Sequence, residues 1–361
     1  MKNTILFGDC RETLKNIDVK ARMCVTSPPY YGLRDYGTAT WIGGDPNCNH
    51  MRDSKVNPDK CITGHKNHDK MAGVGDAIYK KECPKCGAIR QDSQIGLEET
   101  PEEYIENLVE VFRSVRDVLT DDGTLWVNIG DSYYNYRPGK GQALVKQSVS
   151  KTKQDLPDTC GRRGNKLEGL KEKDLIGIPW MLAFALRADG WYLRQDIIWH
   201  KPNPMPESVR DRCTKAHEYI FLLSKNRKYH YDNEAIKEPV KQDWGTRNRT
   251  SGKYHNPGTG LQPHSGLTKS YDRKNKRSVW TVTNKPFKGA HFAVFPPDLI
   301  EPCILAGSEE GDIVLDPFMG SGTTGMLAKK HRRAYIGCEL NEDYANLQTD
   351  RIDSIPPQLV L

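Results

Sequence analysis

The sequence lacks the features of a membrane-spanning or exported protein. No apolar run approaches the roughly 20 residues that a transmembrane helix needs. The apolar start at 4–7 meets Gly8 and Asp9 too soon to form a signal peptide. The chain has 10 cysteines but no export signal, so we expect reduced thiols or metal ligands in place of a disulfide framework. These absences predict a cytoplasmic protein that does not contact a membrane.

A strong overall charge is also lacking, since the formal net charge is only +6 over 361 residues. The charge is unevenly distributed, however. Residues 201–290 contain 19 Lys and Arg against 8 Asp and Glu, a local net charge of +11, which leaves −5 for the remainder. A basic segment on a mildly acidic body is typical of a surface that binds a polyanion, although a solvated basic loop fits the charge equally well.

Strand and helix patterns alternate along the chain, which predicts an α/β fold with a doubly wound, mostly parallel sheet. Thr100, Pro101 and Glu103 predict a helix with a capping box, followed by apolar residues at helical spacing up to Leu119. Residues 178–189 favour a second helix, and 312–339 form a strand, turn, helix and strand unit. Short apolar runs read as further strands at 4–7, 23–26, 124–129, 191–199 and 218–223.

A short proline-rich stretch, Thr26-Ser27-Pro28-Pro29-Tyr30, follows the second predicted strand. Ser27 offers a small hydroxyl group, Pro28 a carbonyl held stiff by the two prolines, and Tyr30 an aromatic face. Two acceptors beside an aromatic ring suit the capture of a flat ring that carries an amino group. A rigid Pro-Pro turn without a chemical role is the alternative interpretation.

A glycine-rich turn follows the strand predicted at 312–316. Gly320, Gly322 and Gly325 have the GxGxxG spacing, which between a strand and a helix indicates a nucleotide-bearing cofactor. Glu339 ends the next strand, where an acid can accept hydrogen bonds from ribose hydroxyls. Asp316 ends the strand before the glycines and suits a cationic group, which favours a cofactor with a charged amino-acid part. A purely structural turn is the alternative.

Together the two stretches resemble the amino-methyltransferases of DNA, which transfer a methyl group from S-adenosylmethionine to an exocyclic nitrogen. Asp316-Pro317-Phe318-x-Gly320-Ser321-Gly322-Thr323 is similar to the cofactor motif of this family throughout. The catalytic stretch precedes the cofactor stretch, as in the circularly permuted β class. The resemblance extends from the first strand to Glu339 and implies a Rossmann-like methyltransferase sheet with DNA as the substrate.

The resemblance also implies roles for single residues. The Ser27 hydroxyl and the Pro28 carbonyl would accept the amino hydrogens of a flipped-out base, on which Tyr30 would stack. The implied catalytic residues are thus Ser27, Pro28, Pro29 and Tyr30. Asp9 would lie near the adenine ring of the cofactor, and Phe292 and Phe295 beside its methionine, although the two aromatics read equally well as core. The full set of expected cofactor contacts is Asp9, Phe292, Phe295, Asp316, Phe318, Gly320, Ser321, Gly322, Thr323, Thr324 and Glu339.

The target atom is predicted to be N4 of cytosine, because Ser before Pro-Pro resembles the cytosine-specific members of the family. Asp or Asn at this position is commoner in adenine-specific members, so N6 of adenine stays the alternative. Methylation at carbon 5 of cytosine would need a cysteine nucleophile, usually in a Pro-Cys pair. Pro302-Cys303 is such a pair, but it lies in an apolar helical stretch and is better interpreted as core, as is Cys24.

Residues 37–94 interrupt the strand and helix pattern with a polar insertion. Cys48, His50, Cys83 and Cys86 have the spacing of a tetrahedral structural zinc site, and a segment with so few apolar residues needs such a centre to fold. Unligated side chains in a loop are the alternative. The fourth ligand stays open, because three more residues of the insertion compete for it: Cys61, His65 and His68.

The expected organisation has four parts. Residues 1–36 and 95–200 form the catalytic part, 37–94 the zinc insertion, 201–289 a basic target-recognition region, and 290–361 the cofactor part. The recognition region contains Arg210, Arg212, Arg247, Arg249, Arg273, Lys274, Lys276 and Arg277, which suit contacts with phosphates and base edges.

A cognate restriction enzyme and a homodimer are further partners that the resemblance leaves open. A nicotinamide-dependent oxidoreductase and a non-catalytic zinc DNA-binding protein are the alternatives from other classes.

Overall fold

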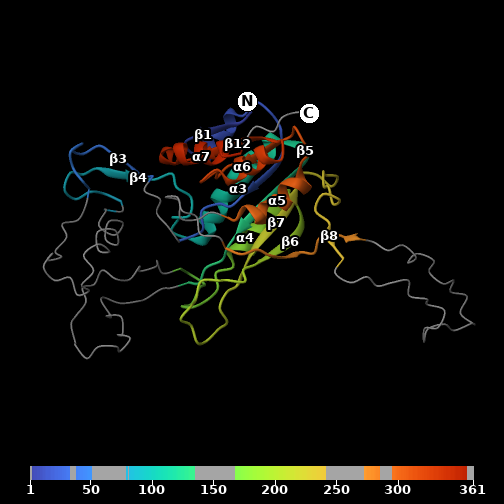
Figure 1. Cartoon of the computed structure of the whole chain (residues 1–361). Helices are drawn as coiled ribbons and strands as arrows, with labels where there is room; N and C mark the ends of the chain where they lie inside the picture. Colours follow the sequence, from blue (N-terminus) through green and yellow to red (C-terminus); the bar gives the residue numbers. More distant parts are fainter. Residues whose placement is uncertain are drawn as a thin grey trace, which may run out of the picture.

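A mostly parallel eight-stranded sheet forms the centre of the computed structural model (Figure 1). The structure describes residues 2–32, 38–50, 79, 81–134, 167–240, 272–284 and 295–355. The strands lie in the order β1 (Thr4–Phe7), β12 (Ala334–Glu339), β11 (Ile313–Asp316), β2 (Ala21–Thr26), β5 (Leu119–Ile129), β7 (His217–Ser224), β6 (Tyr192–His200) and β10 (Val279–Thr281).

The pairing of β2 determines where the two sequence motifs meet. β2 comes from the start of the chain, yet it lies between β5 and β11 and is parallel to both, with Cys24 opposite Leu315. The carboxyl ends of parallel neighbours meet at one edge of a sheet, so the stretch after Thr26 lies beside the turn after Asp316. Among the sheet strands in the described ranges, only β7 runs antiparallel, to both β5 and β6. The doubly wound, mostly parallel prediction is confirmed.

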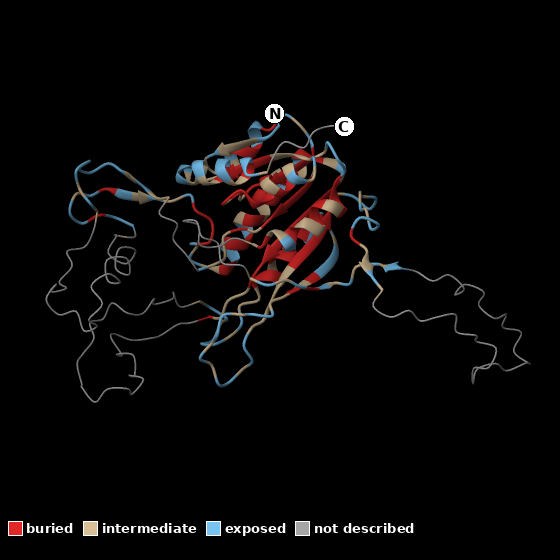
Figure 2. Ribbon diagram, in the orientation of Figure 1, coloured by how far each residue is buried: buried red, intermediate tan, exposed pale blue. Residues whose placement is uncertain are grey.

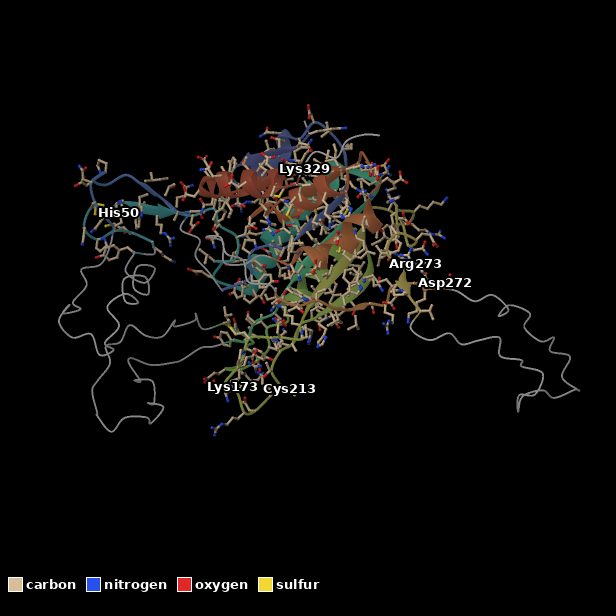
Figure 3. The ribbon with its side chains drawn as sticks, viewed as in Figure 1. His50, Lys173, Cys213, Asp272, Arg273 and Lys329 are labelled. Atoms are coloured by element: carbon tan, nitrogen blue, oxygen red, sulfur yellow. The ribbon has the colours of Figure 1, made fainter. Side chains whose placement is uncertain are left out.

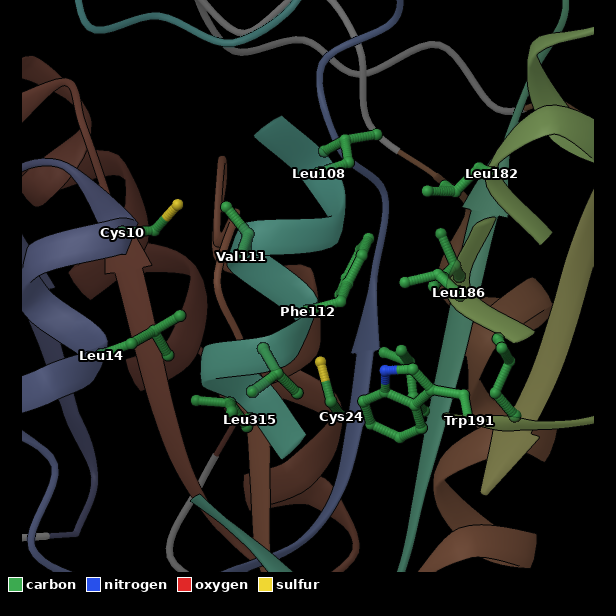
Figure 4. Close-up of a cluster of buried hydrophobic side chains, with 14 of the residues drawn as sticks. Cys10, Leu14, Cys24, Leu108, Val111, Phe112, Leu182, Leu186, Trp191 and Leu315 are labelled. Atoms are coloured by element: carbon green, nitrogen blue, oxygen red, sulfur yellow. The ribbon is translucent and has the colours of Figure 1, made fainter. Parts of the chain in front are cut away.

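Two hydrophobic clusters cover the two faces of this sheet. Figure 2 shows buried residues gathered in the central strands and in the helices beside them. On one face α3 (Pro101–Val118), α4 (Ile178–Ala188) and the short α1 (Cys10–Thr13) pack against Cys24 and Leu315 (Figure 4). On the other face α5 (Pro297–Gly307) and α6 (Thr323–Lys330) pack against Met23, Val25 and Val314. Successive strand residues thus point to opposite faces, and nearly continuous apolar strands are what a sheet covered on both sides requires.

The predicted capping box begins α3. The Glu103 amide donates to Thr100 Oγ1 over 3.2 Å, and the Thr100 amide donates to Glu103 Oε2 over 3.3 Å. Pro101 occupies the first turn, where its missing N–H would have no partner within the helix. α7 (Ala345–Asp353) follows β12 and packs against α6. None of the helices in the described ranges is both long and apolar enough to cross a membrane.

Two small ribbons accompany the sheet. β3 (Thr40–Ile42) and β4 (Ile89–Gln91) pair antiparallel in the insertion and project to one side of the body (Figure 1). β8 (Glu238–Pro239) and β9 (Arg273–Lys274) pair likewise within the basic region. The predicted recognition region 201–289 also contributes β7 and β10 to the central sheet.

Candidate functional site

A cavity of about 550 Å³ opens at the carboxyl edge of the sheet and brings together most of the predicted site residues. Its lining includes all four predicted catalytic residues, Ser27, Pro28, Pro29 and Tyr30. It also includes seven of the predicted cofactor residues: Asp9, Phe295, Phe318, Gly320, Ser321, Thr323 and Glu339. Two motifs almost 300 residues apart in sequence therefore share one site, as the parallel pairing of β2 and β11 requires. Phe292 lies outside the described residues.

Glu339 and the glycine-rich turn form one end of the cavity. The Gly320 amide donates to Glu339 Oε2 over 2.7 Å, and the Asn341 amide donates to Oε1 over 2.9 Å. Burial raises the pKa of Glu339 from its ordinary value of 4.5 to about 7, and the hydrogen bonds oppose this shift. Gly322, at the start of α6, has a φ of 80°, a conformation that side chains with a Cβ rarely adopt.

Asp316 lies beneath the cavity and does not line it. Its carboxylate is fully buried and accepts hydrogen bonds from Thr26 Oγ1 at 2.6 Å, from Thr324 Oγ1 at 2.6 Å and from the Phe318 amide at 3.0 Å. Burial raises its pKa to about 6 despite these bonds. Neither Asp316 nor Thr324 lines the cavity, and their contact with the cofactor stays a prediction. The polar atoms of both residues form hydrogen bonds within the protein, so Asp316 and Thr324 support the turn from beneath the cavity.

Tyr30 is held at the other end of the cavity by a polar cluster on β5, on β7 and at the start of the turn that follows β6. Its hydroxyl donates to Glu218 Oε2 over 2.6 Å, and Asn128 Nδ2 donates to the same oxygen over 3.3 Å. Lys201 Nζ forms an ion pair with the other oxygen of Glu218. Burial, followed by the Glu218 charge, raises the pKa of Tyr30 well above its usual range, so the phenol stays neutral.

The backbone around Tyr30 leaves the ring little freedom. A Cβ atom at Gly130, just after β5, would lie 2.6 Å from Tyr30 Cε2, so the ring packs directly on the glycine backbone. The Pro29 carbonyl accepts a hydrogen bond from the Tyr104 hydroxyl of α3 at 2.8 Å. The catalytic stretch is thus fixed at both ends, by Thr26 on Asp316 and by Pro29 and Tyr30 on the surrounding elements.

Asn128, Lys201 and Glu218 line the cavity but were absent from the predicted site. A signal for two of them was present, because Asn128 and Glu218 are polar residues within apolar strand runs. Lys201 begins the stiff turn after β6 and gives no such signal. Their meeting depends on the antiparallel pairing of β7 with β5 and β6, which local patterns do not specify.

The predicted zinc ligands of the insertion come together beside the β3–β4 ribbon. The ligand atoms of Cys48, His50, Cys83 and Cys86 all lie within 4.8 Å of one another. Cys48 Sγ and Cys83 Sγ are 3.7 Å apart, and Cys86 Sγ lies 3.5 Å from His50 Nδ1. A tetrahedral zinc ion with ordinary bond lengths would separate two sulfurs by about 3.8 Å and a sulfur from a nitrogen by about 3.6 Å. The donor set and its dimensions therefore fit zinc.

An aromatic contact also fixes the histidine of this cluster. His50, labelled in Figure 3, stacks on Trp41 with ring centroids 4.3 Å apart, which orients the imidazole. Cys61, His65 and His68, the competing ligands, lie outside the described residues, as do Arg247 and Arg249 of the basic region.

No nucleophilic role is favoured for Cys303. Its side chain is fully buried in α5, and burial raises the pKa of the thiol well above its usual range. A protonated thiol enclosed by apolar neighbours cannot attack a base. Cys24 is likewise buried with a raised pKa. The interpretation of both residues as core is confirmed.

Comparison with known proteins gives consistent matches over nearly the whole chain. The family model for DNA methylases of the N6 and N4 type matches residues 21–350. The Type II methyltransferase M.SmaI of Serratia marcescens is 42% identical over 349 residues, which cover 96% of this chain and 90% of that protein. The Type II methyltransferase M.Cfr9I of Citrobacter freundii is 41% identical over 350 residues, covering 97% and 87%.

The fold has solved counterparts. The PvuII DNA methyltransferase, described as cytosine-N4-specific, superposes with a TM-score of 0.52 and 15% identity, covering 99% of this chain and 89% of that one. At this level of identity the match establishes the shared fold alone.

Proposed function

The chain belongs to the family of N6 and N4 DNA methylases, and from this membership we propose that it methylates N4 of cytosine at a specific DNA sequence. As a member it is a DNA methyltransferase that uses S-adenosylmethionine. Membership is incompatible with the two readings from other classes, a nicotinamide-dependent oxidoreductase and a non-catalytic DNA-binding protein. The choice between cytosine and adenine belongs to the proposal.

One observation carries the catalytic assignment: the Ser27 stretch and the Gly320 turn line the same cavity. S-adenosylmethionine, when bound, supplies an electrophilic methyl group. The amino nitrogen of a base is a poor nucleophile because its lone pair is delocalised into the ring. Ser27 Oγ and the Pro28 carbonyl would accept its two hydrogens, which draws the nitrogen towards a tetrahedral geometry and aims its lone pair at the methyl group.

Tyr30 would stack on the flipped-out base, and Glu218 would fix the plane of its ring through the hydroxyl. This arrangement makes Glu218 a positioning residue, with Asn128 and Lys201 holding its carboxylate in turn. At the other end Glu339 would accept hydrogen bonds from the ribose of the cofactor, and Phe295 and Phe318 would pack beside it. Asp9, Gly320, Ser321 and Thr323 complete the proposed cofactor contacts.

Cytosine is proposed because a serine stands before Pro-Pro at position 27, as in the cytosine-specific members that the sequence resembles. The alternative, N6 of adenine, uses the same acceptors and the same geometry. Nucleoside mass spectrometry of DNA methylated by the purified enzyme distinguishes the two products.

Zinc is proposed as a structural ion bound by Cys48, His50, Cys83 and Cys86. Support comes from the donor set of three cysteines and one histidine and from two distances that suit a tetrahedral ion, 3.7 Å between two sulfurs and 3.5 Å between sulfur and nitrogen. The site lies beside the β3–β4 ribbon and contributes no residue to the cavity, so it would stabilise the insertion without entering the chemistry.

The remaining proposals concern organisation and partners. We assign 37–94 to the zinc insertion, 201–289 to target recognition outside β7 and β10, and the rest to the methyltransferase body. The relatives are Type II methyltransferases, which supports a cognate restriction enzyme as a partner of the same DNA site. A homodimer and a cytoplasmic location are part of the same proposal.

A further inference from the structure

The turn after β6 carries an exposed apolar side chain at the edge of the cavity. Met205 is 85% exposed, yet it lines the cavity together with Trp199, Lys201 and Asn284. An apolar side chain with so much surface in water contributes little to folding. Met205 follows Lys201 on the same turn, and Lys201 pairs with the Glu218 carboxylate that anchors Tyr30. This neighbourhood points to a role in substrate binding.

Prolines and hydrogen bonds restrict the backbone of this turn on either side of Met205. Pro202, Pro204 and Pro206 alternate with the other residues of the turn and restrict its φ angles. Asn203 Nδ2 donates to the Asn284 carbonyl over 3.2 Å, and the Asn284 amide donates to Asn203 Oδ1 over 3.1 Å. The Lys201 amide donates to the Ala216 carbonyl over 2.8 Å. The turn is therefore tied to two neighbouring segments while the Met205 side chain stays uncovered by any of the described residues.

An enzyme that methylates an amino group inside the double helix must first remove the base from the stack. Unstacking costs a few kcal/mol per base step, and DNA-binding proteins insert apolar side chains between bases. A side chain that fills the gap left by a flipped base replaces part of the lost stacking contacts. Methionine suits such a gap because it is unbranched, polarisable and makes favourable contacts between sulfur and aromatic rings. A rigid turn lowers the entropy lost on insertion.

From these observations we propose that Met205 enters the base stack at the position that the target base vacates. This inference rests on the proposed function, since it assumes that a base leaves the duplex for the cavity. The exposed Arg210, on the same connection between β6 and β7, would hold the adjacent phosphate. Met205 then acts on the flipping step and takes no part in methyl transfer itself.

The test compares two duplexes that contain the sequence which mapping of wild-type methylation identifies. One is fully paired, and in the other the base opposite the target is replaced by an abasic site, which removes the pairing that flipping must break. Single-turnover rates are measured with saturating enzyme and cofactor for wild type, Met205→Ala, Met205→Leu and the control Tyr192→Ala. Tyr192 is 46% exposed at the opposite end of β6.

We expect Met205→Ala to slow methylation of the paired duplex by about tenfold or more, and that of the abasic duplex by no more than about threefold. Met205→Leu should retain most of the rate on both duplexes, and Tyr192→Ala should match wild type. Equal loss on both duplexes would make Met205 part of the pocket wall, and no loss on either would exclude the role; both results overturn the proposal. If the mapping step finds no base that the wild-type enzyme methylates, that result would instead contradict the proposed function.

Discussion

Thr26 donates a 2.6 Å hydrogen bond to Asp316, which lies 290 residues further along the chain. Thr26 precedes the catalytic stretch and Asp316 precedes the cofactor turn, so this bond joins the two halves of the site. Thr324, in the first turn of α6, donates to the second oxygen of the same carboxylate. The relative position of Ser27 and the glycine-rich turn is therefore set by one buried acid.

Replacing this acid should loosen both halves together. Asp316→Ala leaves Thr26, Thr324 and the Phe318 amide without their acceptor, and each buried unsatisfied group costs about 1–3 kcal/mol. We expect the free energy of unfolding to fall by about 2–4 kcal/mol and S-adenosylmethionine to bind at least about tenfold more weakly. Urea unfolding and calorimetry measure the two effects. The exposed Glu342→Ala serves as control, and a variant with unchanged stability and affinity would refute this role for Asp316.

The contact between Tyr30 and Glu218 should affect the rate more than the binding of the cofactor. Tyr30→Phe keeps the ring but removes the hydroxyl that anchors it, whereas Tyr30→Ala also removes the stacking surface, worth about 1–3 kcal/mol per base. We expect kcat to fall in the order wild type, Tyr30→Phe, Tyr30→Ala, with the Kd for S-adenosylmethionine unchanged. Glu218→Gln keeps a hydrogen-bond acceptor for the Tyr30 hydroxyl, and its kcat should be close to that of Tyr30→Phe. A raised Kd with normal kcat would place these residues at the cofactor end.

Stability should depend on pH through Glu339. Its pKa is raised in the folded protein from 4.5 to about 7, so across this range the folded state binds more protons than the unfolded chain. The free energy of unfolding of the cofactor-free protein should thus decrease as pH rises from 4.5 to 7, by up to about 3 kcal/mol from this group. Glu339→Gln should remove that part of the slope, measured by urea unfolding at each pH. Parallel curves of unfolding free energy against pH for Glu339→Gln and wild type would contradict this role of Glu339. The exposed Glu342→Gln is the control and should keep the wild-type slope.

The metal content of the purified protein tests the proposed zinc site of the insertion. Purified protein never exposed to chelator should contain about one zinc ion per chain by elemental analysis. Cys83→Ala should lose the metal, whereas Cys213→Ala should keep it, because Cys213 is exposed and belongs to another segment. Binding of S-adenosylmethionine should survive in both variants, since the zinc ligands do not line the cavity. Wild-type protein without metal would show that the four residues meet for another reason.

Much of the fold could be predicted because its signals are local. The strands 4–7 and 23–26, the capped helix from Pro101 and the last strand–helix–strand unit all follow from apolar spacing and from capping residues within a few positions of one another. The cofactor turn could also be predicted, because its glycines permit backbone conformations that other residues rarely adopt. Local patterns also pointed to the cluster of Cys48, His50, Cys83 and Cys86, within which Cys83 and Cys86 form a turn of their own.

What could not be predicted depends on pairing between distant segments. Asp316 turns inward because Thr26 and Thr324 offer donors beneath the cavity, which the order of residues in the turn does not reveal. Glu218 reaches Tyr30 because β7 runs antiparallel beside β5. The sequence predicted the strand at 218–223, but not its neighbours or its direction. Strand order and direction are properties of the whole sheet, so residues recruited by them were missed.

The identity of the methylated nucleoside tests the central claim most directly. Mixed-sequence DNA is incubated with the enzyme and S-adenosylmethionine, digested and analysed by mass spectrometry, with Ser27→Ala as the matched variant. The account predicts N4-methylcytosine as the product, at least about tenfold less of it per unit time with Ser27→Ala, and the same Kd for the cofactor in both proteins. N6-methyladenine would preserve the mechanism and contradict the assignment to cytosine. Formation of 5-methylcytosine would contradict both.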